Sequence, residues 1–197
     1  MEGGKKKFFS NIGWLMGGKI VNMLLQFFVS LATARYLGPS NFGTINYVAA
    51  FVSFFSSIAS LGLAVIVIKE IATDKYNNNE VIWTSIWMRF ATAVLSTISI
   101  IALMFITNRD DPMIVQIAFL ESLSIIFSSF DTINYYFQAK LLSKWSSIAG
   151  VLAYIGMSLY RIYLLATGAD IVWFAFATST DMIFLTVFLM IFYVRLE

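Results

Sequence analysis

Long apolar stretches alternate with short polar ones along the whole chain. Each apolar stretch holds 22 to 27 residues, enough for an α-helix to cross a hydrocarbon core of ~30 Å at 1.5 Å per residue. Strands of a membrane β-barrel would instead be about ten residues long with strict polar–apolar alternation. The pattern therefore predicts an all-α integral membrane protein with six transmembrane helices, over residues 8–34, 42–68, 81–106, 112–137, 146–167 and 171–194.

The composition supports this class and excludes others. The 197 residues are 59% hydrophobic and 12% charged, about half the charge of a soluble domain. That balance excludes a soluble globular enzyme, a disordered chain and a nucleic-acid binder. Six helices with short connections occupy the whole length, so we expect residues 1–197 to form a single six-helix transmembrane lobe. The first stretch is longer than a signal-peptide apolar region and is interrupted by Lys19, so we expect it to be retained.

Several kinds of chemistry are missing from the sequence. The absence of Cys and His excludes disulfides, thiol chemistry, imidazole-bound metals and a histidine proton relay. No phosphate-binding loop, nucleophile elbow or metal-spaced cluster occurs. We therefore expect no catalytic activity, no ATP hydrolysis, no cofactor and no metal site.

The basic residues outside the apolar stretches predict the orientation. With an inside N-terminus and six spans, eight basic residues fall on the inner side and only Arg35 and Arg109 on the outer side. This asymmetry places both chain ends in the cytoplasm. The inner residues are Lys5, Lys6, Lys7, Lys69, Lys75, Lys140, Lys144 and Arg195.

Six ionisable residues lie inside the predicted spans: Lys19, Arg89, Arg161, Glu121, Asp131 and Asp181. A charge at mid-bilayer costs ~2.5–3.5 kcal/mol, so such side chains face a bundle interior or an aqueous cavity. Other polar residues recur three and four positions from them, which places them on the same helix faces. These polar stripes include Asn22 and Gln26 on the first span and Gln138 at the end of the fourth.

Two interpretations of these charges compete. In the first, they neutralise one another as structural ion pairs, and matching residues by depth pairs Arg89 with Asp131, Lys19 with Asp181 and Arg161 with Glu121. In the second, the polar faces line a hydrated cavity. Its cations then bind an anionic substrate, and its carboxylates titrate with a coupling ion. We favour the cavity, because stripes along full spans indicate a wall that faces water.

The connection between the first two spans, residues 34–43, reads ARYLGPSNFG. Gly38 and Pro39 are expected to stop the first helix there. The segment resembles the AR-x-LG-P-x-x-F-G signature of Wzx-type polysaccharide flippases, in the multidrug/oligosaccharidyl-lipid/polysaccharide exporter superfamily. Arg35, Gly38, Pro39 and Gly43 carry the likeness. It continues, less specifically, through residues 60–63, 69–72, 131 and 136–140.

The resemblance implies a transporter that flips polyprenyl-diphosphate-linked oligosaccharide from the inner to the outer leaflet of the cytoplasmic membrane, by ion counterflow. Lys19, Arg89 and Arg161 would then form the cationic, substrate-binding part of the cavity. The ion-coupling candidates would be Glu121, Asp131 and Asp181, and the polar lining would include Asn22, Gln26 and Gln138. The expected partners are membrane lipid and the lipid-linked glycan.

The length departs from that family, whose members are expected to have 12 or 14 spans in two lobes. The chain looks like the N-terminal lobe alone, so a C-terminal lobe or a second copy would have to complete the cavity. Three alternatives stay open: a peptidoglycan-precursor flippase, a multidrug antiporter and a non-transporting membrane fragment. The multidrug alternative fits less well, because its first span is expected to carry an acidic residue or a proline bend, and this span carries Lys19 instead.

Overall fold

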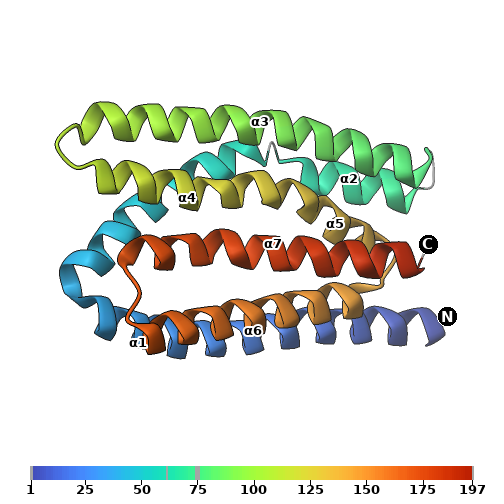
Figure 1. Ribbon diagram of the computed structural model, residues 1–197. Coiled ribbons are helices and arrows are strands. Elements are labelled where there is room, and N and C mark those ends of the chain that lie inside the picture. Colours follow the sequence, from blue (N-terminus) through green and yellow to red (C-terminus); the bar gives the residue numbers. More distant parts are fainter. Residues whose placement is uncertain (1, 61, 74–75, 197) are drawn as a thin grey trace.

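Long helices run side by side along one axis in the computed structural model, which describes residues 2–60, 62–73 and 76–196, with side chains from residue 9 onward (Figure 1). No strand occurs in these ranges, so the all-α prediction is confirmed. The elements are α1 (Glu2–Ala59), α2 (Leu63–Ala72), α3 (Asn78–Thr107), α4 (Pro112–Ser128), the 3₁₀ turn η1 (Ser129–Asp131), α5 (Thr132–Ala139), α6 (Ser143–Thr167) and α7 (Ile171–Leu196).

Five helical stretches of the described chain are long and apolar enough to cross a membrane. The first, Phe9–Ala59, has 51 residues, about 77 Å of helix and more than twice the thickness of a hydrocarbon core. It therefore has the length for two crossings, which the sequence places over 8–34 and 42–68. Both chain ends lie at the same end of the bundle (Figure 1), as an even number of crossings requires. The count of six and the cytoplasmic position of the ends stay predictions.

The turn between the two predicted crossings in α1 is made at one residue. Gly38 has φ 73° and ψ 172°, a conformation that only glycine adopts readily. Pro39 follows as the first residue of the next helical segment, where its missing N–H does no harm. The sequence predicts a longer non-helical connection, but only Gly38 departs from helical geometry. The turn is fixed to the start of α7, since the Tyr36 hydroxyl donates a hydrogen bond to the Ala169 carbonyl at 3.2 Å.

The predicted span over 42–68 is not a continuous helix. Helix α1 ends at Ala59 and α2 begins at Leu63, after Gly62 in the left-handed conformation (φ 61°). The hydroxyl of Thr92 on α3 donates a hydrogen bond to the freed carbonyl of Ala59 at 2.9 Å. A neighbouring helix thus satisfies the broken backbone, which is the condition for an interruption at membrane depth. The predicted span over 112–137 is likewise interrupted, by the 3₁₀ turn η1.

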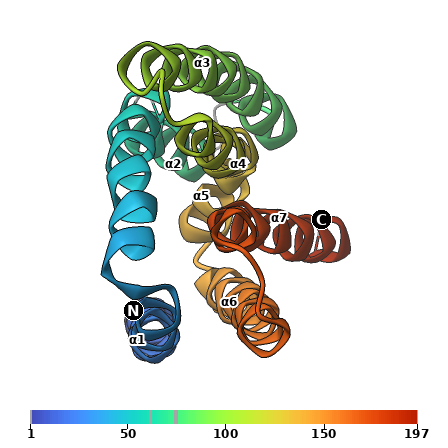
Figure 2. The ribbon, with the colours of Figure 1, turned by 60° about the vertical axis from the view of Figure 1, so that its left-hand side comes forward.

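Neighbouring helices meet in the order α1, α6, α7, α4 and α3. The first half of α1 lies at the edge of the bundle beside α6, and the second half crosses towards α3 (Figure 2). Among the described residues, three apolar clusters fill the interior, and the two larger ones lie at opposite ends. The first includes Val48, Ile100, Ile117 and Phe174, and the second includes Ile71, Phe137 and Leu189.

A glycine pair tests the turn in α1. Gly38→Ala is expected to destabilise the protein by about 1–3 kcal/mol, because a Cβ is strained at that backbone conformation. Gly43→Ala is the matched control, since no atom lies within 4 Å of a Cβ added there and no unusual φ is present. Thermal unfolding in detergent should show a lower Tm for the first variant only. Equal Tm values would contradict the strained-turn assignment.

Candidate functional site

Two separate groups of charged side chains lie inside the bundle. The first, which we name the Arg161 cluster, consists of Arg161 and Tyr154 on α6, Glu121 on α4 and Asp181 on α7. Arg161 interacts electrostatically with all three other members. Tyr154 and Arg161 are seven residues apart and so share one face of α6. The cluster therefore joins the three helices that pack consecutively in this part of the bundle.

Hydrogen bonds within the Arg161 cluster are incomplete. Glu121 is only 1% exposed, yet neither of its carboxylate oxygens has a hydrogen-bond partner. The buried Nε of Arg161 also has none. A structural ion pair in a low-dielectric interior would normally close such bonds, because an unsatisfied buried charge is costly. The cluster has two carboxylates for one guanidinium. Both the Glu121 carboxylate and the Arg161 guanidinium keep atoms that can still accept or donate a hydrogen bond.

The second group, the Arg89 cluster, is closed by hydrogen bonds. Arg89 on α3 is 6% exposed; its Nη1 donates to the Thr132 hydroxyl at 3.4 Å, and its Cζ lies 5.7 Å from the centre of the Tyr135 ring. It also acts electrostatically on Asp131. Asn134 donates to the Asp131 carboxylate at 3.2 Å.

Asn134 also connects the Arg89 cluster to its surroundings. Its carbonyl oxygen accepts hydrogen bonds from the Ser146 hydroxyl on α6 and from the Gln138 amide on α5, the latter at 3.4 Å. Side chains from α3, η1, α5 and α6 are thus tied together at the interruption between α4 and α5. Such a satisfied network favours a fixed, structural role for these residues.

The polar stripe on the first half of α1 belongs to neither cluster. Lys19 and Gln26 are exposed, whereas Asn22 is half-buried, and its buried Oδ1 has no hydrogen-bond partner. The predicted pairing of Lys19 with Asp181 is wrong, because the basic residue that acts on Asp181 is Arg161. For the other two pairings the structure shows an electrostatic influence, of Arg89 on Asp131 and of Arg161 on Glu121.

The residues of the signature turn do not reach these clusters. Gly38 and Pro39 form the bend in α1, and Arg35 and Gly43 are exposed on either side of it. Gly38 and Pro39 thus shape the chain. Within the described residues, no group of three or more carboxylates could hold a metal ion.

The sequence analysis did not single out Thr132, Asn134 or Ser146, which complete the Arg89 cluster. For Asn134 a signal was present, because it stands three residues after Asp131 and so faces the same way on a helix. Ser146 had no comparable signal. It enters the cluster through the packing of α6 against α5, which the sequence does not reveal.

The helices and their buried charges define an all-helical, multi-pass membrane protein. Comparison with known families narrows this class to one family. The chain belongs to the family described as "Polysaccharide biosynthesis protein", whose family model matches residues 8–196. Its members are transporters and flippases rather than enzymes. The resemblance read from the signature turn is thereby confirmed at the level of the family. No curated protein and no solved structure matches the chain.

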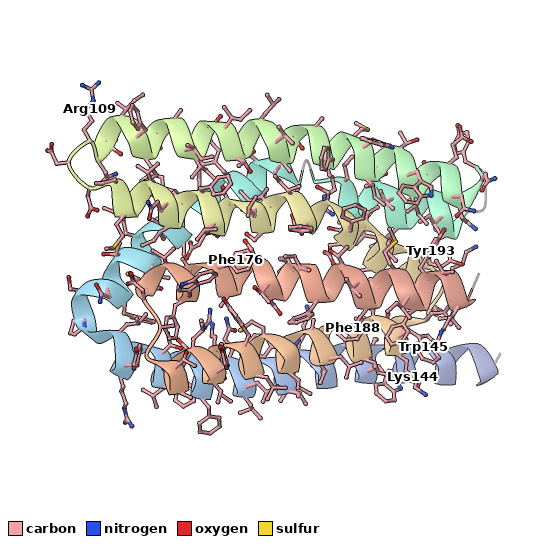
Figure 3. All side chains as sticks on the ribbon, viewed as in Figure 1. Arg109, Lys144, Trp145, Phe176, Phe188 and Tyr193 are labelled. Atoms are coloured by element: carbon pink, nitrogen blue, oxygen red, sulfur yellow. The ribbon has the colours of Figure 1, made fainter. Side chains whose placement is uncertain are left out.

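Charge removal tests the Arg161 cluster. Arg161→Met is expected to destabilise the protein by on the order of 3 kcal/mol, because it leaves Glu121 and Asp181 without their cation. The triple variant with Glu121→Gln and Asp181→Asn added should recover most of the loss. Arg109→Met, on an exposed residue at the far end of the bundle (Figure 3), should change stability by less than about 0.5 kcal/mol. Denaturation in detergent measures all three. Equal stability of Arg161→Met and Arg109→Met would contradict the electrostatic interaction of Arg161 with the two carboxylates.

Proposed function

We propose that the protein moves polyprenyl-diphosphate-linked oligosaccharide from the inner to the outer leaflet of the cytoplasmic membrane, coupled to ion counterflow. Membership of a polysaccharide-export family supports the substrate class. The observation that carries the proposal is the Arg161 cluster, in which one guanidinium faces two carboxylates without a closed set of hydrogen bonds.

The Arg161 cluster provides a simple exchange. A diphosphate competes with Glu121 and Asp181 for the guanidinium, because Arg presents a planar fork that suits phosphate oxygens. Without substrate, the two carboxylates exceed the one guanidinium by one negative charge, so they can hold a coupling cation or proton beside Arg161. The diphosphate and this cation-loaded carboxylate pair then occupy Arg161 by turns, as counterflow requires.

The exposed face of α1 supports a further part of the proposal. Lys19 and Gln26 are exposed on a helix of membrane-spanning hydropathy, and a charge facing lipid there would cost ~2.5–3.5 kcal/mol. A water-filled cavity closed by a second lobe or a second copy removes that cost. We therefore propose that this α1 face lines the path of the sugar, opposite such a partner.

Translocation in proteoliposomes tests the function. The full chain is reconstituted with a fluorescent polyprenyl-diphosphate oligosaccharide, and transfer is read with a membrane-impermeant quencher under an imposed H⁺ or Na⁺ gradient. Arg161→Lys keeps the charge but loses the fork, and should slow transfer at least about tenfold, since a charge-assisted hydrogen bond is worth ~1.5–3 kcal/mol. Glu121→Gln should abolish the acceleration by the gradient.

Arg109→Lys is the control for the transport assay, because Arg109 is exposed at the far end of the bundle and points away from it (Figure 3). It should transfer substrate at the wild-type rate. Wild-type protein that leaves the labelled lipid in its original leaflet would refute the proposal. Equal rates for Arg161→Lys and Arg109→Lys would remove the cluster from the mechanism.

Cross-linking tests the partner of α1. The chain has no cysteine, so Gln26→Cys introduces a unique thiol on the exposed face. Oxidation in native membranes should yield a disulfide-linked dimer if a second copy covers this face. Phe54→Cys, at a side chain 62% exposed on the second half of α1, is the control and should stay monomeric. A monomer from both variants would exclude a second copy of the chain at this face.

A further inference from the structure

An apolar groove runs between the first half of α1 and the start of α6, away from both charge clusters. It has a volume of about 640 Å³ and is lined by Gly13, Trp14, Gly17 and Val21 of α1 and by Ile148 and Leu152 of α6, among others. A Cβ built on Gly13 or Gly17 would meet no atom within 4 Å. The two glycines therefore leave a hollow that the protein itself does not fill.

Close contacts hold α1 and α6 together along the groove. The Ser147 hydroxyl on α6 donates a hydrogen bond to the Trp14 carbonyl of α1 at 2.8 Å. The Ser143 amide at the start of α6 donates to the Asn11 side chain at 2.8 Å, and Asn11 is 8% exposed. Gly18 lies so close to Ser147 that a Cβ there would come within 3.0 Å of it. The two helices are thus held at a set distance, and the groove is preformed.

The extent of the groove matches one leaflet of a bilayer. Its α1 lining runs from Ser10 to Val21, about 17 Å along the helix axis, and half of a ~30 Å hydrocarbon core is about 15 Å. A transmembrane helix that docked here would need an apolar surface across both leaflets, which is about twice the length of this groove. The dimensions therefore fit a lipid chain of the leaflet nearest the N-terminus.

A cation stands at the headgroup end of the groove. Lys144 is three residues before Ser147 on α6, and its Nζ lies 5.4 Å from the centre of the Trp14 ring and 5.8 Å from that of Trp145. Figure 3 shows Lys144 and Trp145 together at this end of the bundle. Tryptophan rings anchor at the membrane interface, and an ammonium held on them attracts an anionic headgroup.

We propose that this groove is a binding site for an anionic glycerophospholipid of the inner leaflet. One acyl chain lies over Gly13 and Gly17, and the phosphate lies beside Lys144. The chain fills a hollow whose walls would otherwise lack contacts on one side. The site is independent of the proposed transport function, because none of the residues of the Arg161 cluster takes part in it.

Native mass spectrometry of the full chain, equilibrated with phosphatidylglycerol and phosphatidylcholine of identical acyl chains, tests the site. Wild type should retain phosphatidylglycerol about fivefold more than phosphatidylcholine. Lys144→Gln should bind both equally, and Gly17→Leu, which fills the groove, should lose both. The matched controls are Arg109→Gln for the charge and Gly43→Leu for the volume, since a Cβ on Gly43 also meets open space. Both should behave as wild type.

Four results would overturn the proposal. Gly17→Leu that retains lipid like wild type would show that the groove is not the site, and Lys144→Gln that keeps the preference would remove the headgroup contact. Polyprenyl phosphate added as competitor should leave phosphatidylglycerol in place. If it displaced the phospholipid at equal concentration, the groove would belong to the substrate tail. A dimer that Gly17→Leu dissociates, with no lipid bound to wild type, would assign the groove to a second copy.

Discussion

The hydrocarbon interior offers no water to a backbone or side-chain polar group, and this constraint governs the structure. It explains why the two helix interruptions both lie against α3. The carbonyl freed at Ala59 accepts a hydrogen bond from Thr92 of α3. Arg89 of α3 donates to the Thr132 hydroxyl at the start of α5, and that hydroxyl itself donates to the Ser129 carbonyl of η1. A break at Ala59 that faced lipid would leave its carbonyl without this partner.

The same constraint separates the two arginines that the sequence presents as equivalent. Arg89 donates to Thr132 and lies beside the Tyr135 ring, in a network that includes Asn134. Glu121, beside Arg161, leaves two buried oxygens without partners. Buried polar atoms without a protein partner mark a place where a ligand, an ion or an ordered water can bind. The unsatisfied cluster is therefore the better candidate for function, and the satisfied one for architecture.

The sequence predicted the helices well because long apolar stretches have no other stable form in a bilayer. It missed the interruption between Ala59 and Leu63, since the serine, leucine and glycine that the sequence has there disturb hydropathy little. It also paired Lys19 with Asp181 by counting depth along straight helices. Depth says nothing of which helices are neighbours, and α6 stands between the first half of α1 and α7. Neighbour order comes from side-chain packing across the bundle, which periodicity does not encode.

Helix α1 presents two exposed surfaces of opposite character. Lys19 and Gln26 form a polar face, whereas Gly13 and Gly17 line an apolar groove. Both surfaces exist because the bend at Gly38 lets the second half of α1 join the core around Val48 while the first half lies at the edge beside α6 (Figure 2). A lipid chain seated in the groove would bury the apolar surface without covering the polar one. The polar surface would then stay free to face a substrate path, which makes the bend at a single glycine the feature on which both roles of α1 depend.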